Sequence, residues 1–362
     1  MHILAKWLKH TFSDPQIVFL SLFLILSFVL ILTVGNMLMP VLASAVIAYL
    51  LEGIVSLLER RGLPRLFSVV VVFIGFILFV VLVIFGLIPS LSRQLSQLVN
   101  QLPDIITQGQ QTLMQLPDKY PGYISTEHIQ EISAVIRREI TNFGQELVSI
   151  SLSSVVGLIT LMIYLVLMPL LVFFFLKDKQ LISEWFTGFL PKDRALATKV
   201  WDDVDRQVAN YVRGKFAEIL IVWAVSLVVF TLFGLQYAML LSVLVGLSVI
   251  IPYIGAAVVT IPVLMIAWFQ WGWSPEFIWL SVAYGVIQAL DGNVLVPMLF
   301  SEVVNLHPVA IVVAILLFGG FWGFWGVFFA IPLATLVQAV INAWPGITYT
   351  SDDTELEVSD AE

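Results

Sequence analysis

The residues best suited to chemistry lie within an otherwise apolar stretch, residues 285–308, that is long enough to cross a bilayer. Asp291 supplies a carboxylate there, and Gln288, Asn293 and Asn305 supply neutral amides. A charged side chain at the centre of a spanning helix costs about 2.5 kcal/mol or more, so such a residue normally faces protein or a water-filled cavity. We therefore predict that Asp291 is a protonatable or cation-binding group and that the three amides are its partners.

The same pattern also fits a structural role for these residues. Gln288 and Asp291 are three positions apart, which places them on one face of a helix. Asp291 could cap a broken helix through nearby backbone donors and hold Gly292 in a bend. Both interpretations require a buried carboxylate, so the sequence leaves both open. His307, directly before Pro308, is better explained as a polar residue at a helix start than as a proton relay.

The composition is that of a membrane protein. Of the 362 residues, 60% are hydrophobic and 12% are charged, whereas about a quarter of the residues in soluble proteins are charged. The absence of cysteine excludes disulfides, thiolate catalysis and cysteine-ligated metal, and the four histidines are too scattered for a metal cluster. We expect no metal, no cofactor and no enzymatic activity, since the apolar core offers no nucleophile and base pair.

The basic residues are distributed asymmetrically, and this predicts the topology. None of the 17 Lys and Arg residues follows Lys215, and Lys6 and Lys9 precede the first apolar run. Because cytoplasmic loops carry the excess of basic residues, we expect a cytoplasmic N terminus. The predicted segments are spans 1 to 3 in residues 1–89, an extramembrane arm in 90–150, span 4 in 151–176, a basic cytoplasmic loop in 177–215, a transport core in 216–344 and an acidic disordered tail in 345–362.

The predicted arm is polar and rich in glutamine, yet it repeats apolar residues at helical spacing. Leu91, Leu95, Leu98 and Leu102 follow one another at steps of three and four. This period indicates amphipathic helices that lie outside the membrane or on its surface. An arm for assembly or gating and a solvated bundle without further role both fit this pattern.

The transport core contains apolar runs that cannot be single straight helices. Residues 238–269 would extend about 48 Å as one helix, whereas the bilayer core is about 30 Å thick. Residues 308–344 pose the same problem. Paired interrupted helices of this kind indicate a transporter site. The predicted helix breaks are Pro252, Gly255, Gly292, Pro297, Gly319 and Gly320.

The fifth predicted span, residues 216–233, carries a further acidic residue. Glu218 lies one turn inside this span. It is a candidate solute-binding or ion-binding residue, although an interfacial ion pair or stabilisation by the helix dipole also explains a carboxylate in the first turn.

In total the sequence predicts an all-α, polytopic helical membrane protein with about eight spans and both termini in the cytoplasm. The motifs Pro252-Tyr-Ile-Gly255, Asp291-Gly-Asn-Val-Leu-Val-Pro297 and Asn305-Leu-His-Pro308, with the glycine-rich residues 318–332, resemble the autoinducer-2 exporter (AI-2E) family of permeases. The resemblance covers nearly the whole chain. It implies an inner-membrane protein that forms a homo-oligomer, expected to be a pentamer, and exports a small polar solute. Some relatives are associated with cation/proton antiport, so the substrate does not follow from the fold.

The predicted function is a secondary transporter driven by a proton or sodium gradient, since no Walker motif for ATP binding is present. Its expected partners are the lipid bilayer, a small polar solute and a coupling cation, and no nucleic acid. Two alternatives remain: a cation/proton antiporter, and a non-transporting scaffold that recruits partners through the arm and the cytoplasmic loop.

Overall fold

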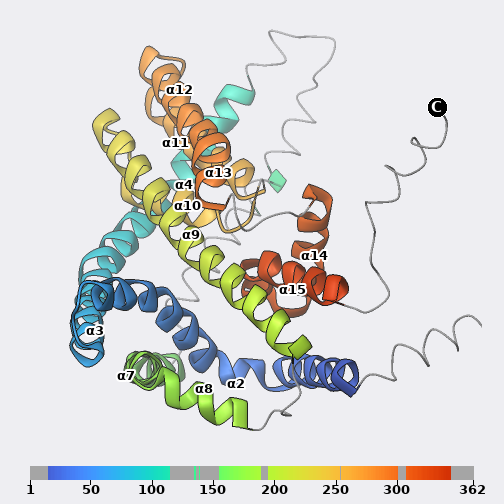
Figure 1. Ribbon diagram of the computed structural model, residues 1–362. Helices are drawn as coiled ribbons and strands as arrows, with labels where there is room; N and C mark the ends of the chain where they lie inside the picture. The colour runs from blue at the N-terminus through green and yellow to red at the C-terminus, as the bar shows by residue number, and fades with distance from the viewer. Residues whose placement is uncertain are drawn as a thin grey trace, which may run out of the picture. The chain divides into compact units, whose positions relative to one another are not determined.

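The structure, a computed structural model, describes residues 15–114, 134–135, 138, 155–188, 195–252, 254–300 and 307–343 (Figure 1). Within these ranges the regular elements are all helices, and no strand forms. The predicted all-α fold is therefore confirmed. Asn305, the tail at 345–362 and most of the predicted arm beyond residue 114 lie outside the described residues.

The helices follow one another along the chain, with two short π-helical turns, η1 and η2, between α-helical segments. The elements are α2 (Pro15–Arg60), α3 (Arg65–Leu82), η1 (Val83–Leu87), α4 (Ile88–Leu113), α7 (Val155–Lys177), α8 (Lys179–Gly188), α9 (Ala195–Phe233), α10 (Ala238–Ser248), α11 (Ile254–Trp271), α12 (Pro275–Leu290), η2 (Asp291–Leu295), α13 (Val296–Phe300), α14 (Pro308–Phe328) and α15 (Ala330–Ala343).

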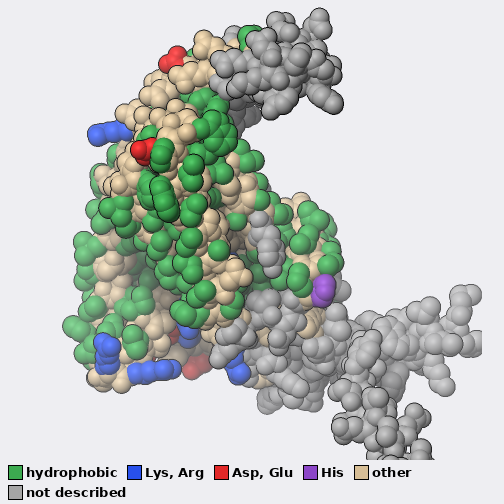
Figure 2. Space-filling model, turned by 90° about the horizontal axis from the view of Figure 1, so that it is seen from above, with side chains coloured by type: hydrophobic (Ala, Val, Ile, Leu, Met, Phe, Trp, Pro, Cys, Tyr) green, Lys and Arg blue, Asp and Glu red, His purple; other side chains and the backbone are tan. Residues whose placement is uncertain are grey.

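Several of these helices are long and apolar enough to cross a membrane. Among the described residues there are six such segments, namely Met37–Arg60, Arg65–Gln111, Asp205–Phe233, Ile254–Trp271, Pro275–Phe300 and Pro308–Phe328. Two shorter apolar helices, Ile163–Lys177 and Ala238–Ser248, accompany them. Hydrophobic side chains also cover much of the described surface seen in Figure 2, as expected where helices face lipid. The chain is thus a multi-pass membrane protein.

The chain divides into two compact units that each combine distant parts of the sequence. One unit comprises Met1–Arg65, Leu171–Ala217 and Leu295–Glu362, and the other comprises Leu66–Leu170 and Glu218–Val294. These boundaries group the chain differently from the predicted segments, because the units follow tertiary contacts and not the order of spans.

In the first unit, Arg65 at the start of α3 joins α2 to α7. The Arg65 guanidinium lies 3.4 Å from the Glu52 carboxylate and 3.3 Å from that of Glu59. It also donates a hydrogen bond of 2.8 Å to the Leu176 carbonyl, in the last turn of α7. The last carbonyls of a helix have no partner within the helix, so a guanidinium is a favourable cap at this position.

In the second unit, α4 packs against α10, so the part of the predicted arm up to Leu113 lies against another helix. The Tyr237 hydroxyl donates to Oε1 of Gln101 (2.6 Å), and Oε1 of Gln94 accepts from the backbone N–H of Leu240 (2.9 Å). Burial raises the pKa of the Tyr237 hydroxyl. These two glutamines of α4 therefore bind the start of α10. Gln94 accepts one of the first N–H groups of α10, which have no partner within their own helix.

The break between α10 and α11 depends on a close backbone approach. A Cβ atom on Gly255 would lie 1.7 Å from the Ser248 carbonyl oxygen, so only glycine fits here. Pro252 lies in the turn between the two helices, where its missing N–H costs little.

The break in α14 occurs at Gly323, which has a φ of 57° and a ψ of −133°. Gly319 and Gly320, the predicted break positions, lie in the helical part before it. Gly319 instead permits close packing, because its Cβ would lie 2.8 Å from the Val327 side chain. Gly326 has the same role, since its Cβ would lie 1.9 Å from the Phe318 carbonyl oxygen. The turn at Gly323 thus brings two parts of α14 together.

The predicted break at Gly292 and Pro297 takes the form of a π-helical turn, η2, after which the helix continues as α13. Pro297 is the second residue of α13, just as Pro89 is the second residue of α4 after η1. A π turn shifts the backbone pairing by one residue, and a proline, which has no N–H to donate, is tolerated where that pairing changes.

Candidate functional site

A line of polar side chains joins α11 to α12 in the second unit. Nε2 of Gln288 lies 2.8 Å from the Tyr284 hydroxyl, which in turn lies 3.2 Å from Oγ1 of Thr260. Thr260 donates to the Ala256 carbonyl (2.7 Å), so the Tyr284 hydroxyl is left to donate to Oγ1 of Thr260. Tyr284 is only 2% exposed. Because hydrogen bonds in series polarise one another in a low-dielectric interior, this chain, the α11–α12 polar ladder, is a stable polar path through an apolar helix pair.

Asp291 lies one helical turn beyond Gln288, the last residue of the polar ladder. It is half-buried, its Oδ1 atom is shielded from solvent, and its backbone N–H is shared between the carbonyls of Gln288 and Ile287. It is also the first residue of η2. Single π turns within α-helices are rare and occur frequently at functional sites. The structure therefore places the predicted carboxylate where the backbone pairing itself is irregular.

Asn293 and Gly292 complete this turn in different ways. Nδ2 of Asn293 donates to the Ala289 carbonyl (2.8 Å), so its amide serves the backbone of its own helix, and the side chain is exposed. A Cβ atom on Gly292 would meet no atom within 4 Å. Asn293 thus satisfies a carbonyl at the π turn, and Gly292 leaves open space beside Asp291.

A second group of candidate residues lies on α9, within the candidate span Asp205–Phe233. Glu218 is 2% exposed and Lys215 is 3% exposed, three residues earlier on the same helix. Nζ of Lys215 lies 5.1 Å from the centroid of the Phe300 ring, a favourable cation–π position. Lys215 was not predicted, because it follows Arg213 and resembles a basic flank of the span. The sequence signal that could have singled out Lys215 is its spacing, because it lies three residues before the oppositely charged Glu218 on the same helix face.

Tyr211, also on α9, fixes the end of α14. Its side chain is 1% exposed, and its hydroxyl donates to the Phe328 carbonyl (2.9 Å) at the last residue of α14. Its ring lies 5.8 Å from the ring of Phe300 and 6.3 Å from that of Phe328. Gly214 allows this approach, because its Cβ would lie 2.9 Å from the Phe300 ring. The interrupted helix α14 is thus held at its C-terminal end by a buried hydroxyl.

Replacing Tyr211 by Phe keeps the ring and removes the hydroxyl that donates to the Phe328 carbonyl. We expect Tyr211→Phe to destabilise the protein by about 1–3 kcal/mol. The thermal unfolding temperature of the full-length protein in detergent measures the effect. Tyr164→Phe, in α7, is the matched control and should leave this temperature unchanged. Equal unfolding temperatures for the two variants would contradict a role for the Phe328 contact.

The remaining predicted residues have limited structural roles or cannot be placed. His307 precedes α14 and accepts the backbone N–H of Val309 at Nδ1 (3.2 Å), with Pro308 as the first helical residue. Asn305 lies outside the described residues. Among the residues that the structure describes, no group of three or more His, Asp or Glu side chains is arranged to hold a metal.

Comparison with known proteins identifies the family. The sequence pattern of the AI-2E family transporter matches residues 17–346. The chain is 44% identical over 345 residues to the "Putative permease PerM" of Escherichia coli (strain K12), which covers 95% of this chain and 98% of that protein. It is 27% identical over 316 residues to the "Putative transport protein YueF" of Bacillus subtilis (strain 168), with 85% and 84% covered. The predicted resemblance to this family is confirmed. The chain belongs to the AI-2E family of transporters.

Proposed function

We propose that this membrane transporter is a secondary transporter that exports a small polar solute, with export coupled to a proton or sodium gradient. Family membership favours transport over catalysis. The export of a small polar solute rests on the family resemblance, and the coupling to an ion gradient rests on the residues of α11, α12 and η2.

The observation that carries this proposal is the position of Asp291. A carboxylate at the first residue of a π turn, one helical turn beyond a buried polar ladder, combines a titratable group with irregularly paired backbone. Such backbone within a membrane is tolerated where protein or water satisfies it. Together these groups can bind a coupling cation and a polar solute.

In the proposed mechanism Asp291 binds the coupling ion and Gln288 contacts the solute. An ionised carboxylate favours a conformation in which water or a cation reaches it, whereas a protonated one tolerates apolar surroundings. Binding of the ion therefore shifts the population between two conformations, by as much as its affinity for them differs. The breaks at Gly255 and Gly323 supply positions about which helices can move relative to one another.

The buried Lys215 and Glu218 are two further ionisable groups in a span. Buried charges in membrane helices mark solute or ion pathways by default, because they are costly elsewhere. We assign Glu218 a supporting role in ion binding, and Lys215 a fixed positive charge above the Phe300 ring.

We also propose an inner-membrane location with both termini in the cytoplasm, and assembly into a homo-oligomer, expected to be a pentamer. The basic residues before the first span and in residues 177–215 support this orientation. The family resemblance supports the oligomer.

Flux measurements in proteoliposomes test the proposal. Candidate polar solutes are followed under imposed proton or sodium gradients, with the wild type compared to Asp291→Asn. The proposal requires flux that depends on a gradient in the wild type. Solute flux that is indifferent to both gradients would contradict it.

A cation/proton antiporter is the second candidate, favoured by the Asp291 carboxylate on the same stretch of helix as the neutral amides of Gln288 and Asn293. It predicts proton movement in response to a sodium gradient when no organic solute is present. The same vesicles distinguish the two functions, because a solute exporter moves few protons until its solute is added.

A further inference from the structure

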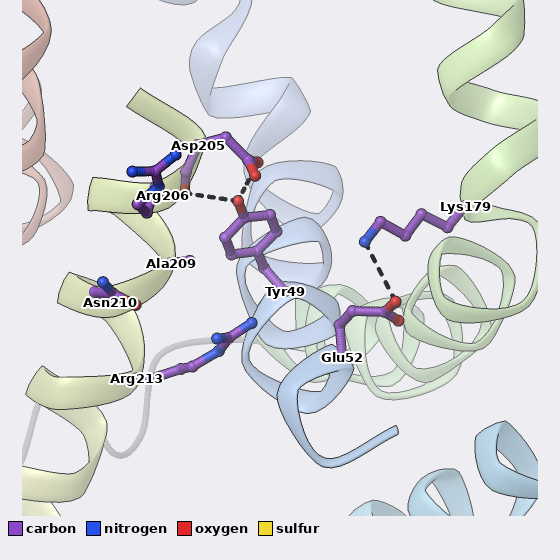
Figure 3. Close-up of a pocket in the computed structure, with 8 residues that line it drawn as sticks. All are labelled: Tyr49, Glu52, Lys179, Asp205, Arg206, Ala209, Asn210 and Arg213. Atoms are coloured by element: carbon purple, nitrogen blue, oxygen red, sulfur yellow. Dashed lines mark hydrogen bonds and ion pairs between the residues drawn. The ribbon is translucent and has the colours of Figure 1, made fainter. Parts of the chain in front are cut away.

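A polar cavity in the first unit is separate from the residues of the proposed transport path. Its volume is about 420 Å³. Figure 3 shows the side chains that line it, which come from α2, α8 and α9. Its lining consists of Tyr49, Glu52, Lys179, Asp205, Arg206, Ala209, Asn210 and Arg213. We call this the α2–α9 pocket.

The two acidic residues of the pocket are already engaged. Glu52 lies 3.4 Å from Arg65 and 3.3 Å from Lys179, so two cations neutralise its charge. The Tyr49 hydroxyl donates to the carboxylate of Asp205 and to its backbone carbonyl. Two cations thus neutralise Glu52, and the Asp205 carboxylate, which keeps its charge, already accepts a hydrogen bond.

The two arginines of the pocket are in the opposite situation. Arg206 and Arg213 are seven residues apart on α9 with Asn210 between them, so all three lie on one helix face. No described residue forms an ion pair or hydrogen bond with either guanidinium. The Arg213 side chain packs against Gly53 of α2, where a Cβ atom would lie 2.9 Å from Nε of Arg213. Glycine at this position leaves the space that the guanidinium occupies.

This arrangement is suited to an oxyanion. A guanidinium presents parallel N–H groups that match two oxygens of a phosphate, and such charge-assisted hydrogen bonds are among the strongest in proteins. Asn210 adds an amide donor, and the lining has a net positive formal charge, with three cations and two carboxylates. Small-molecule pockets measure about 300–1,000 Å³, so the cavity is large enough for a phosphate with a substituent.

We propose that the α2–α9 pocket binds a phosphate group between Arg206 and Arg213. The pocket lies among the basic residues from which we predict the cytoplasmic side. On that side of the membrane, phosphates are available both as lipid headgroups and as free phosphorylated solutes. The shared chemistry is the phosphate oxyanion. The site is independent of the solute and ion proposed for Asp291.

Binding to the purified full-length protein in a neutral detergent tests this proposal. The probes are inorganic phosphate and a short-chain phosphatidylglycerol, with the matching phosphatidylcholine as the zwitterionic reference, and calorimetric titration gives each Kd. We expect the Arg206→Gln/Arg213→Gln double variant to weaken the binding by at least about tenfold, the loss of one or two charge-assisted hydrogen bonds. The single variant Arg213→Gln should lose part of the affinity, and it replaces the double variant if that variant does not fold.

The matched control is Arg60→Gln/Arg61→Gln, which removes the same charge from exposed positions of the first unit outside the pocket. This control should bind both probes as the wild type does. Binding of phosphatidylglycerol alone identifies a lipid headgroup site, and binding of phosphate alone identifies a soluble ligand; both support the proposal. It is overturned if neither probe binds, or if the two double variants lose equal affinity, which would indicate nonspecific attraction to a basic surface.

Discussion

Asp291→Asn should reduce gradient-driven solute flux in proteoliposomes by at least about tenfold, the effect of about 1.4 kcal/mol on a rate. The amide has nearly the same shape as the carboxylate, but it can neither take up a proton nor bind a cation through a negative charge. If Asp291 couples the ion gradient to the solute, Asn at this position leaves only uncoupled exchange. The assay compares initial rates with and without the gradient.

Asn293→Ala is the control for this prediction, because Asn293 lies two residues further on, is exposed and bonds only the Ala289 carbonyl. We expect it to keep most of the gradient-driven rate. A wild-type rate in Asp291→Asn would show that the carboxylate only caps the π turn, which is the structural alternative. Comparable losses in both variants would show that the turn matters and the charge does not.

Gly255→Ala should cause the largest loss of stability. The new Cβ atom would lie 1.7 Å from the Ser248 carbonyl oxygen and 2.6 Å from its carbon, and both are backbone atoms that cannot rotate away. The break between α10 and α11 would have to open, at a cost of about 3 kcal/mol. The measurement is the thermal unfolding temperature of the full-length protein in detergent, together with the fraction that remains monodisperse.

Gly285→Ala provides the comparison, since Gly285 is exposed on α12 and its Cβ would meet no atom within 4 Å. Alanine is a better helix former than glycine by about 1 kcal/mol, so this variant should be as stable as the wild type or slightly more stable. Similar unfolding temperatures for Gly255→Ala and Gly285→Ala would mean that the close approach at the break is not essential.

The sequence was sufficient to predict the helical membrane fold and its interrupted C-terminal helices, because apolar runs longer than the bilayer must break. It could not select the residue of the break in α14. Gly319, Gly320, Gly323 and Gly326 are equivalent in an apolar run, and only tertiary packing decides which one adopts a positive φ. A proline near Asp291 predicts a disturbed helix, but it does not distinguish a π turn from a complete interruption.

The candidate site was predictable where the residue type is unusual for its surroundings. Asp291 and Gln288 stand out because polar groups in a span are costly. Tyr284 and Thr260 do not stand out, since hydroxyl residues are common in spans and their pairing depends on how α11 packs against α12. Lys215 was missed because a basic residue at the start of a span usually belongs to the interface.

Water access beside Asp291 is the central requirement of the transport proposal, and one cysteine tests it directly. The natural sequence contains no cysteine, so Gly292→Cys introduces a single thiol at a position with open space, while Asp291 is kept. Val286→Cys, on the exposed apolar face of α12, is the lipid-facing control. Because the thiolate is the nucleophile that attacks a maleimide, and it forms in water and not in lipid, we predict that a membrane-impermeant maleimide labels Gly292→Cys in proteoliposomes much faster than Val286→Cys. Equally slow labelling of both positions would contradict a water-accessible compartment at η2.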